Sequence, residues 1–583
     1  MNYNPENPII VQGDKSVLLE VDSPHYPAAR DVLARFAELE KSPEYIHTYR
    51  ISPLSLWNAA AAGLNAEAIL EGLDRYAKYP VPGNVRVDIT EYISRYGRVK
   101  LIKRDGELLL VSDDVALMTE LARRKELRPF ILSTVDKQTL VMEAARRGHI
   151  KHALVEVGYP AEDLAGYITG EELEIFLRPV TLTGKEFSLR HYQEEAAAVY
   201  YADGAASGGS GVIVLPCGAG KTMVGLAAMV AQKTSTLVLT PNAFSVQQWI
   251  AEILDKSTLT ADQVGEYTGQ RKEICPVTVA TYQTITYHKR GSRGNKVEGA
   301  TLADEYPHFE LFNRRDWGLI IYDEVHLLPA PVFSISAELQ ARRRLGLTAT
   351  LVREDGREED VFSLIGPKKY DVPWKDLERQ GWIAEADCTE IRVPMPDDLR
   401  MEYALAEQRQ KYRIAACSRG KLEILDQLLE KHTRDQVLII GMYLEQLDQV
   451  LRRYGFPIIT GATPQRERQE LIQRFRSGEL RQLIISKVGN FAIDLPDANV
   501  MIQISGTFGS RQEEAQRLGR ILRPKGNGQL AHFYTLVTKD SQDQEFGANR
   551  QLFLTEQGYQ YTILYADEVA AFQPRKLTTD EKP

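Results

Sequence analysis

The stretch Gly211-Val212-Ile213-Val214-Leu215-Pro216-Cys217-Gly218-Ala219-Gly220-Lys221-Thr222 indicates a buried strand, a glycine-rich turn and the start of a helix. Small residues let backbone N–H groups approach an anion closely, and the helix that follows adds its positive end. In such a loop Lys221 can reach the β- and γ-phosphates of a nucleotide, and the Thr222 hydroxyl can ligate Mg²⁺. Leu215 stands where the general template G-x-x-x-x-G-K-[ST] has its first glycine. On this loop alone, an ordinary glycine-rich turn is therefore an open alternative.

The totals of the chain predict a multidomain globular protein. Its 583 residues are too many for one core, and about three to five domains are expected. We find no apolar run of about 18 residues and no secretory signal, so we expect a cytoplasmic protein without a membrane partner. The four cysteines are far apart and predict reduced thiols rather than a metal site. A net charge of −9 neither supports nor excludes a nucleic-acid partner, because a local basic groove can lie on an acidic protein.

The first third of the chain mixes short strands and helices. In residues 1–97 we predict amphipathic helices over 27–39 and from Asn65, a typical N-cap residue, to 77. In residues 98–182 we predict strands over 99–102 and 107–111 and helices over 114–124 and 137–147. We therefore predict that both regions form small α+β domains.

From about residue 183 the pattern changes to alternating strands and helices, which is typical of parallel α/β units. Short apolar runs at 211–215, 236–239, 277–280 and 318–322 predict strands that are covered on both faces. Ligands of such sheets bind at the carboxyl ends of the strands. We therefore expect functional side chains directly after these runs.

The run Asp323-Glu324-Val325-His326 follows the apolar strand at 318–322. Downstream of a phosphate-binding loop, Asp323 can hold the Mg²⁺ that bridges the phosphates, and Glu324 can activate the attacking water. His326 is placed to sense the state of the site. Asp-Glu at a strand end could also be a simple cap, but its occurrence together with the loop and the ordered strands makes nucleotide hydrolysis the better interpretation.

A second α/β half is predicted over 391–567. Strands are expected over 436–440, 482–485 and 500–504, followed by a helix over 516–523. Helical spacing places Arg520 and Arg523 on one face, where guanidinium groups suit a phosphate whose charge shifts during transfer. A solvated basic helix is the alternative.

Together these motifs resemble the XPB helicases, the DNA-repair and transcription-factor IIH type of superfamily 2. The motifs that carry the resemblance are Leu189-Arg190-His191-Tyr192-Gln193, the L-P-C-G-A-G-K-T loop from Leu215 to Thr222, Asp323-Glu324-Val325-His326, L-G-L-T-A-T from Leu345 to Thr350, Arg353-Glu354-Asp355, I-S-K-V-G from Ile485 to Gly489, and Q-R-L-G-R-I-L-R from Gln516 to Arg523. The family loop explains Leu215. The resemblance is strong over about 185–567 and looser over 1–180.

The resemblance implies a role for each matching residue. Arg190 and Gln193 would read the adenine, and ATP phosphates would bind Pro216, Cys217, Gly218, Ala219, Gly220, Lys221 and Thr222. Asp323 and Glu324 would activate metal and water, with Mg²⁺ held by Thr222 and Asp323. Thr348 and Thr350, with His326, would couple hydrolysis to movement. Gln516, Arg520 and Arg523 would contact the γ-phosphate, and Arg353, Glu354 and Asp355 would assist strand separation.

The implied architecture has two RecA-like lobes. We expect an N-terminal accessory domain (1–97), a damage-recognition-like domain (98–182), lobe 1 (183–390), lobe 2 (391–567) with a short thumb-like insertion near 397–419, and a flexible tail (568–583). The implied activity is 3′→5′ DNA unwinding driven by Mg²⁺-ATP, with backbone contacts from loops such as 240–244 and 505–510. An accessory repair protein or nuclease is an expected partner. A double-stranded DNA translocase and an ATP-switched DNA-binding module stay open as alternatives.

Overall fold

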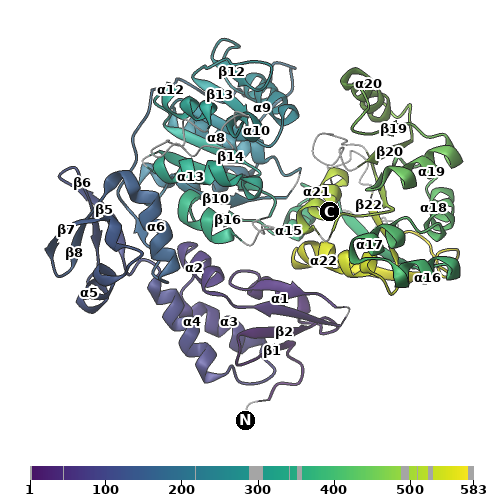
Figure 1. Cartoon of the computed structure of the whole chain (residues 1–583), viewed down its shortest axis with the longest axis horizontal. Coiled ribbons are helices and arrows are strands. Elements are labelled where there is room, and N and C mark those ends of the chain that lie inside the picture. The colour runs from purple at the N-terminus through teal and green to yellow at the C-terminus, as the bar shows by residue number, and fades with distance from the viewer. Residues whose placement is uncertain are drawn as a thin grey trace. The chain divides into compact units, whose positions relative to one another are not determined.

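The computed structural model describes residues 3–43, 45–216, 218–287, 306–340, 342–350, 357–486, 498–508, 510–522 and 530–575. The chain divides into two compact units, and Figure 1 labels their elements. Unit 1 comprises residues 1–38, 49–215 and 220–371, and unit 2 comprises residues 39–48, 216–219 and 372–583. Among the described helices, none combines the length and the apolar run needed to traverse a bilayer.

The N-terminal region is a small α+β assembly. Its elements are β1 (Ile9–Val11), β2 (Ser16–Glu20), α1 (Tyr26–Leu33), β3 (Glu38–Lys41), β4 (Ile46–Arg50), α2 (Pro53–Ala61), α3 (Ala66–Tyr76) and α4 (Gly83–Arg95). Asn65 caps α3 as predicted, because its side chain accepts a hydrogen bond from the Ala68 N–H. The helix predicted over 27–39 is wrong at its end. It stops at Leu33, and the chain buries Phe36 in a turn before it enters β3.

A second α+β region follows, with a five-stranded sheet in the order β7-β8-β6-β5-β9. Its elements are β5 (Lys100–Arg104), β6 (Glu107–Val111), α5 (Val115–Arg123), β7 (Ile131–Asp136), β8 (Thr139–Met142), α6 (Arg147–Glu156) and β9 (Glu162–Asp163). The helix predicted over 137–147 is wrong, because β8 lies within this segment and pairs antiparallel with β6 and β7, and the α-helix α6 begins only at Arg147. Leu140 and Met142 are buried in that sheet, so tertiary pairing decided the conformation of this segment.

Helix α6 attaches this region to the next part of unit 1. A Cβ built on Gly148 would lie 2.5 Å from the Ala337 carbonyl oxygen, so the first turn of α6 is in backbone contact with α13 (Ala330–Glu338). One turn further along α6, the buried Lys151 Nζ donates a 3.0 Å hydrogen bond to Gln340 Oε1. Both contacts hold the small α+β region against the larger sheet of the same unit.

That larger sheet has seven strands in the order β12-β13-β11-β14-β15-β10-β16, and all its strand pairs are parallel. The remaining elements of unit 1 are α7 (His191–Tyr201), β10 (Ser210–Val214), α8 (Lys221–Gln232), β11 (Thr236–Thr240), α9 (Ala243–Lys256), β12 (Val264–Tyr267), β13 (Val277–Thr281), α10 (Tyr282–Ile285), α12 (Leu311–Arg314), β14 (Leu319–Asp323), β15 (Arg343–Thr348), α14 (Glu358–Asp360) and β16 (Lys368–Asp371). Every residue of β10, β11 and β13 is buried, as the apolar runs predict for strands covered on both faces.

Unit 2 contains a second parallel sheet of seven strands, in the order β19-β20-β18-β21-β22-β17-β23. Its elements are α15 (Trp374–Arg379), β17 (Ala386–Val393), α16 (Asp397–Leu405), α17 (Gln408–Ala416), α18 (Gly420–Lys431), β18 (Val437–Gly441), α19 (Leu444–Tyr454), β19 (Ile458–Ile459), α20 (Gln465–Arg476), β20 (Gln482–Ser486), β21 (Val500–Gln503), α21 (Arg511–Ile521), β22 (Ala531–Thr538), α22 (Gln542–Glu556) and β23 (Tyr561–Tyr565). The two parallel sheets confirm the predicted α/β class.

Two predicted limits of the second lobe need correction. A boundary at 390 would cut β17, and the compact units divide instead between Asp371 and Val372. The predicted flexible tail at 568–583 begins inside the core of unit 2, where Val569 is fully buried and Phe572 packs against the same apolar cluster. Lys431 Nζ also donates a 3.1 Å hydrogen bond to the Ala570 carbonyl. Residues 576–583 lie outside the described part of the chain.

Candidate nucleotide-binding site

The glycine-rich loop joins β10 to α8, as predicted. Gly218 and Gly220 both have left-handed backbone conformations, with φ of 83° and 81°, which glycine adopts without the steric cost that a Cβ brings. Gly220 is the N-cap residue of α8, and Lys221 is the first residue of the helix. The loop therefore presents the positive end of a helix, together with a lysine, at the carboxyl end of a buried strand, which suits an anion.

Gln193 in α7 lies directly against this loop. Its side chain is 3% exposed, and a Cβ built on Gly220 would meet Gln193 Nε2 at 2.6 Å. Gln193 Oε1 accepts a 3.0 Å hydrogen bond from the Arg190 N–H, and the Arg190 guanidinium donates a 2.9 Å bond to the Tyr192 hydroxyl. The structure thus brings the predicted Arg190 and Gln193 together at the start of α7, with Gln193 at the loop.

The carboxylates after β14 reach the same loop. Lys221 Nζ lies 3.3 Å from Glu324 Oε1, and both side chains are largely buried. Glu324 itself is left-handed, with φ of 50°, a conformation that is strained for a residue with a Cβ. Asp323 accepts a 2.9 Å hydrogen bond on Oδ2 from Trp249 Nε1, and its carbonyl accepts a 2.8 Å bond from the Tyr282 hydroxyl.

The environment separates the pKa values of the two carboxyl groups. Burial, together with the neighbouring Glu324 charge, raises the pKa of Asp323 to about 6. Burial opposes ionisation of Glu324 as well, but Lys221 and His326 outweigh it and lower the pKa of Glu324 below its ordinary value. At neutral pH both groups are ionised, with Glu324 held as the more stable carboxylate.

His326 extends this cluster toward the end of β15. Its Nδ1 lies 3.5 Å from Glu324 Oε2 and 2.6 Å from Thr348 Oγ1. Thr348 Oγ1 in turn donates a 2.6 Å hydrogen bond to the Thr350 carbonyl and accepts a 3.1 Å bond from the Thr350 N–H. A continuous line of polar contacts therefore runs from Lys221 through Glu324 and His326 to the Thr348–Thr350 segment.

The described residues fit a magnesium ion that is shared with phosphates. They hold no cluster of three or more His, Cys, Asp or Glu side chains that could form a complete metal cage. Mg²⁺ needs no such cage, since it usually takes one or two protein oxygens together with phosphate oxygens and water. Thr222 and Asp323 would hold it. Within the described part of the chain the buried Glu324 Oε2 accepts no hydrogen bond, which leaves it available to a water.

Several predicted site residues lie outside the described residues. These are Cys217, Arg353, Glu354, Asp355 and Arg523. Positions Gln516 and Arg520 lie in α21, as the predicted helix requires, while their side chains are outside the description.

Three family models match successive parts of the chain. The family described as "ERCC3/RAD25/XPB C-terminal helicase" matches residues 377–582, "Type III restriction enzyme, res subunit" matches residues 186–353, and "Helicase conserved C-terminal domain" matches residues 9–136. The DNA 3'-5' helicase XPB of Mycobacterium tuberculosis is 52% identical over 565 residues, which cover 97% of this chain and 99% of that protein. The chain belongs to the XPB helicase family.

More distant XPB relatives align over nearly the whole chain as well. The general transcription and DNA repair factor IIH helicase/translocase subunit XPB of Encephalitozoon cuniculi is 34% identical over 574 residues, covering 96% of this chain and 83% of that protein. Among solved structures, the Hef helicase domain of Pyrococcus furiosus is 16% identical with a TM-score of 0.41, covering 61% of this chain and 97% of that one.

Sequence reasoning missed two residues of this XPB site. Trp249 lies in α9 and Tyr282 at the start of α10, and each donates a hydrogen bond to Asp323. The only available signal was chemical, since a buried Trp or Tyr usually finds a partner for its polar atom. That signal says nothing about which partner, because Asp323 is distant from both in the sequence.

Proposed function

We propose that this XPB-family protein is an ATP-dependent DNA helicase that moves 3′→5′ and couples Mg²⁺-ATP hydrolysis to opening of the duplex. The observation that carries the proposal is the line of contacts from Lys221 through Glu324 and His326 to Thr348. It connects Lys221 and Glu324, which suit phosphate chemistry, with the segment at Thr348, through which hydrolysis would be coupled to movement. The names of the relatives, DNA 3'-5' helicase XPB among them, support the same activity.

The loop and α7 would bind the nucleotide. Gln193 and Arg190 would contact the adenine, while Pro216 to Gly220 would surround the phosphates and Lys221 would pair with the β- and γ-phosphates. Thr222 and Asp323 would hold Mg²⁺, which supplies neutralisation of the charge that develops on the phosphates. Gln516, Arg520 and Arg523 would stabilise the γ-phosphate by the same electrostatic means.

Glu324 is the proposed general base. Its lowered pKa keeps the carboxylate ionised, and Lys221 holds one of its oxygens at 3.3 Å. The other oxygen, Oε2, faces His326 Nδ1 at 3.5 Å and can accept the proton of an attacking water. A change in charge at Glu324 would act on His326 and, through the 2.6 Å contact, on Thr348.

The remaining roles rest on the family. Arg353, Glu354 and Asp355 would assist strand separation, and loops such as 240–244 and 505–510 would contact the DNA backbone. Residues 98–182 would act as a damage-recognition-like domain, residues 1–97 as an accessory domain and the α16–α17 pair, near 397–419, as a short thumb. The setting would be cytoplasmic DNA repair or transcription-linked opening, with an accessory repair protein or nuclease as partner.

Steady-state ATPase and strand displacement test the proposal. Opening DNA costs about 1.4 kcal/mol per base-pair step, so unwinding requires repeated turnover. We expect DNA to stimulate the ATPase, and we expect forks with a 3′ tail to open while forks with a 5′ tail stay paired. Displacement of a third strand from a triplex without fork opening would show a double-stranded translocase. A lack of turnover with DNA present would show a switch instead of a motor.

A further inference from the structure

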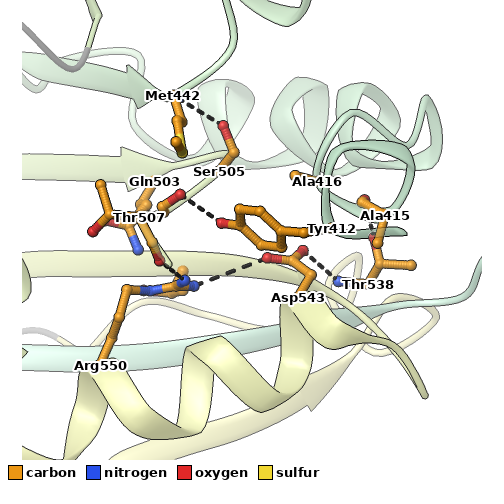
Figure 2. A network of polar contacts seen from close by, with 12 residues as sticks. Tyr412, Ala415, Ala416, Met442, Gln503, Ser505, Thr507, Thr538, Asp543 and Arg550 are labelled. Atoms are coloured by element: carbon orange, nitrogen blue, oxygen red, sulfur yellow. Dashed lines mark hydrogen bonds and ion pairs between the residues drawn. The ribbon is translucent and has the colours of Figure 1, made fainter. Parts of the chain in front are cut away.

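The loop at residues 504–508, which follows β21 in unit 2, is held by side chains from three helices. Each of three loop carbonyl oxygens accepts a hydrogen bond from a different helix: Ile504 O from Lys421 Nζ of α18 at 3.0 Å, Gly506 O from the Tyr412 hydroxyl of α17, and Thr507 O from an Arg550 guanidinium N–H of α22 at 2.8 Å. Figure 2 shows Tyr412 and Arg550 converging on the loop from different elements. The Ile504 N–H still donates a 2.9 Å hydrogen bond to the Ile440 carbonyl of β18, and beyond it buried side-chain donors hold the loop carbonyls.

Ser505, which lies between Ile504 and Gly506, is also held by hydrogen bonds. Ser505 Oγ donates a 2.6 Å hydrogen bond to Gln446 Oε1. It also accepts a 2.8 Å bond from the Met442 N–H, which Figure 2 shows. A Cβ built on Gly506 would lie 2.3 Å from Arg550 Cζ, so only glycine lets the loop backbone approach that guanidinium so closely. Nothing larger fits at this position without moving the arginine.

Two of these three donors, Lys421 and Arg550, belong to a chain of buried charges of alternating sign. It runs Lys421, Asp543, Arg550, Glu514, Arg517, with closest N–O distances of 2.6, 4.0, 3.7 and 3.9 Å between successive members. All five side chains are fully buried. Burying charges has a large desolvation cost, and apolar side chains of similar volume often stabilise a fold at least as well. Stability alone therefore does not explain the chain.

The chain of charges ends in α21. Glu514 accepts a 3.0 Å hydrogen bond from Gln503 Nε2, and Arg517 donates to Gln503 Oε1, so α21 is bonded to the last residue of β21. The same helix carries positions Gln516 and Arg520. The buried charges therefore connect the 504–508 loop to α21. Lys421 and Arg550 contact the loop carbonyls, and Glu514 and Arg517 of α21 contact Gln503.

The helix α17 is fastened to the same core. The Ala415 carbonyl accepts a 2.7 Å hydrogen bond from Thr538 Oγ1, and the Ala416 carbonyl accepts a 2.8 Å bond from Gln446 Nε2. Burial and the nearby Asp543 charge raise the pKa of Tyr412 well above its ordinary value, so its hydroxyl keeps the proton that it donates to Gly506. Tyr412 is consequently a fixed donor on a fixed helix.

We propose that Tyr412 and the five buried charges are positioning residues that couple DNA contact at the 504–508 loop to α21, and through α21 to ATP turnover. This inference rests on the proposed function. The physical basis is electrostatic. The loop carbonyls are hydrogen-bonded to Lys421 and Arg550, and buried ion pairs through Asp543 and Glu514 link these two cations to α21. A shift of the loop would therefore separate buried charges that have no water to replace their partners. A loop held only by solvent could bind DNA but could not transmit the contact.

The substitution Tyr412→Phe tests this with the smallest change, because it removes the hydroxyl and keeps the ring. We expect the ATPase rate at saturating DNA to fall about tenfold, the effect of one unsatisfied buried carbonyl, while the rate without DNA stays within about twofold. The matched control is Tyr403→Phe in the neighbouring α16, which also removes a hydroxyl that bonds a backbone group, the Gln542 N–H at 2.9 Å. This control should keep full DNA stimulation.

Two results would overturn the inference. In one, Tyr412→Phe and Tyr403→Phe show equal stimulation. In the other, a higher DNA concentration restores the full rate of Tyr412→Phe, since the loop would then serve affinity alone. Arg550→Lys is a second variant, because lysine keeps the charge but cannot reach Thr507 and Glu514 with the same planar fork. It should reproduce the loss of stimulation.

Hydrogen exchange separates failure of this inference from failure of the proposed function. Even if the wild-type protein showed no DNA-stimulated turnover, Tyr412→Phe should raise amide exchange in both the 504–508 loop and α21, and Tyr403→Phe should raise it in neither. Faster exchange in the loop with unchanged α21 would show that the two are not linked, whatever the enzyme does with DNA.

Discussion

Lys221 Nζ, at the first residue of α8, lies 3.3 Å from Glu324 Oε1, which follows β14. The two residues are more than a hundred positions apart in the sequence, and they meet because β10 and β14 both border β15 in one parallel sheet. The contact joins the proposed phosphate-binding lysine to the proposed base. It also explains why the pKa of Glu324 is lowered despite burial.

Replacing Glu324→Gln removes the negative charge and keeps the shape of the side chain. We expect ATP turnover to fall by about 10²–10⁴ while nucleotide binding is retained, because the variant lacks the proton acceptor only. Steady-state ATPase and nucleotide titration measure the two effects. Glu266→Gln is the control, a buried glutamate in the same sheet that accepts hydrogen bonds from Gln247 and Thr268. Near-normal turnover of Glu324→Gln would refute its assignment as the base.

Gly220→Ala tests the fit of the loop against α7. Alanine at φ of 81° costs about 1–2 kcal/mol, and its Cβ would also press on Gln193 Nε2 at 2.6 Å. Gly184 has the same φ with nothing within 4 Å, so Gly184→Ala isolates the conformational cost. We expect Gly220→Ala to lose at least as much thermal stability as Gly184→Ala, and only Gly220→Ala to lose nucleotide affinity, by about tenfold or more. Equal affinities would show that Gln193 and the loop do not act together.

Thr348→Val breaks the polar line beyond His326. Valine has the shape of threonine but no hydroxyl, so the 2.6 Å contact with His326 and both bonds to Thr350 are lost. We expect the ratio of base pairs opened to ATP molecules hydrolysed to fall about tenfold, while the rate of ATP hydrolysis itself is less affected. Thr236→Val, at a buried threonine of β11 that bonds the Thr234 carbonyl, should leave the ratio unchanged. A proportional loss of both activities would argue against a coupling role.

Binding of Mg²⁺ should weaken in mild acid, because the pKa of Asp323 is raised to about 6. Below this pH the carboxyl is protonated, and proton competition should reduce apparent Mg²⁺ affinity by about tenfold per pH unit. The stability of the metal-free protein should depend on pH in the opposite direction. A raised pKa of Asp323 stabilises the fold at low pH, and this contribution is lost as the pH rises through about 6. Mg²⁺-dependent thermal shifts with ATP, recorded from acid to neutral pH, measure the midpoint.

The same experiment has an internal check in Trp249. Its indole N–H donates to Asp323 Oδ2 and favours the ionised carboxylate. Trp249→Phe should therefore raise the pKa of Asp323 further and move the loss of Mg²⁺ affinity to higher pH. A midpoint that does not respond to Trp249→Phe would show that another group titrates.

Gly148→Ala tests the attachment of α6. The added methyl would meet the Ala337 backbone at 2.5 Å, and backbone cannot swing aside, so we expect a loss of about 1–3 kcal/mol in the free energy of unfolding. Gly83 also lies in the first turn of a helix, α4, with nothing within 4 Å of an added Cβ. Gly83→Ala should be neutral or mildly stabilising in the same denaturant titration. Equal stabilities would mean that α6 adapts without cost.

Much of the fold could be predicted, because parallel strands covered on both faces need continuous apolar runs. The runs at β10, β11, β13 and β14 are such segments, and Glu324, which follows β14, lies 3.3 Å from Lys221 at the start of α8. The positive φ angles of Gly218 and Gly220 could also be predicted, because a turn that exposes backbone N–H groups favours residues free to adopt positive φ. These are local properties, and a local pattern of residues is enough to specify them.

Other features depended on partners that are far away in the chain. The sequence pattern predicts a helix over residues 137–147, yet β6 and β7 pair with Thr139–Met142 and impose a strand. Trp249 and Tyr282 acquired their roles only from the position of Asp323, and residues 568–575 pack on a core that lies earlier in the chain. Lys421 and Asp543, far apart in the sequence, form a fully buried ion pair at 2.6 Å. Only the tertiary structure decides such contacts, because the free energy of a buried polar group depends on the atoms around it and not on its neighbours in sequence.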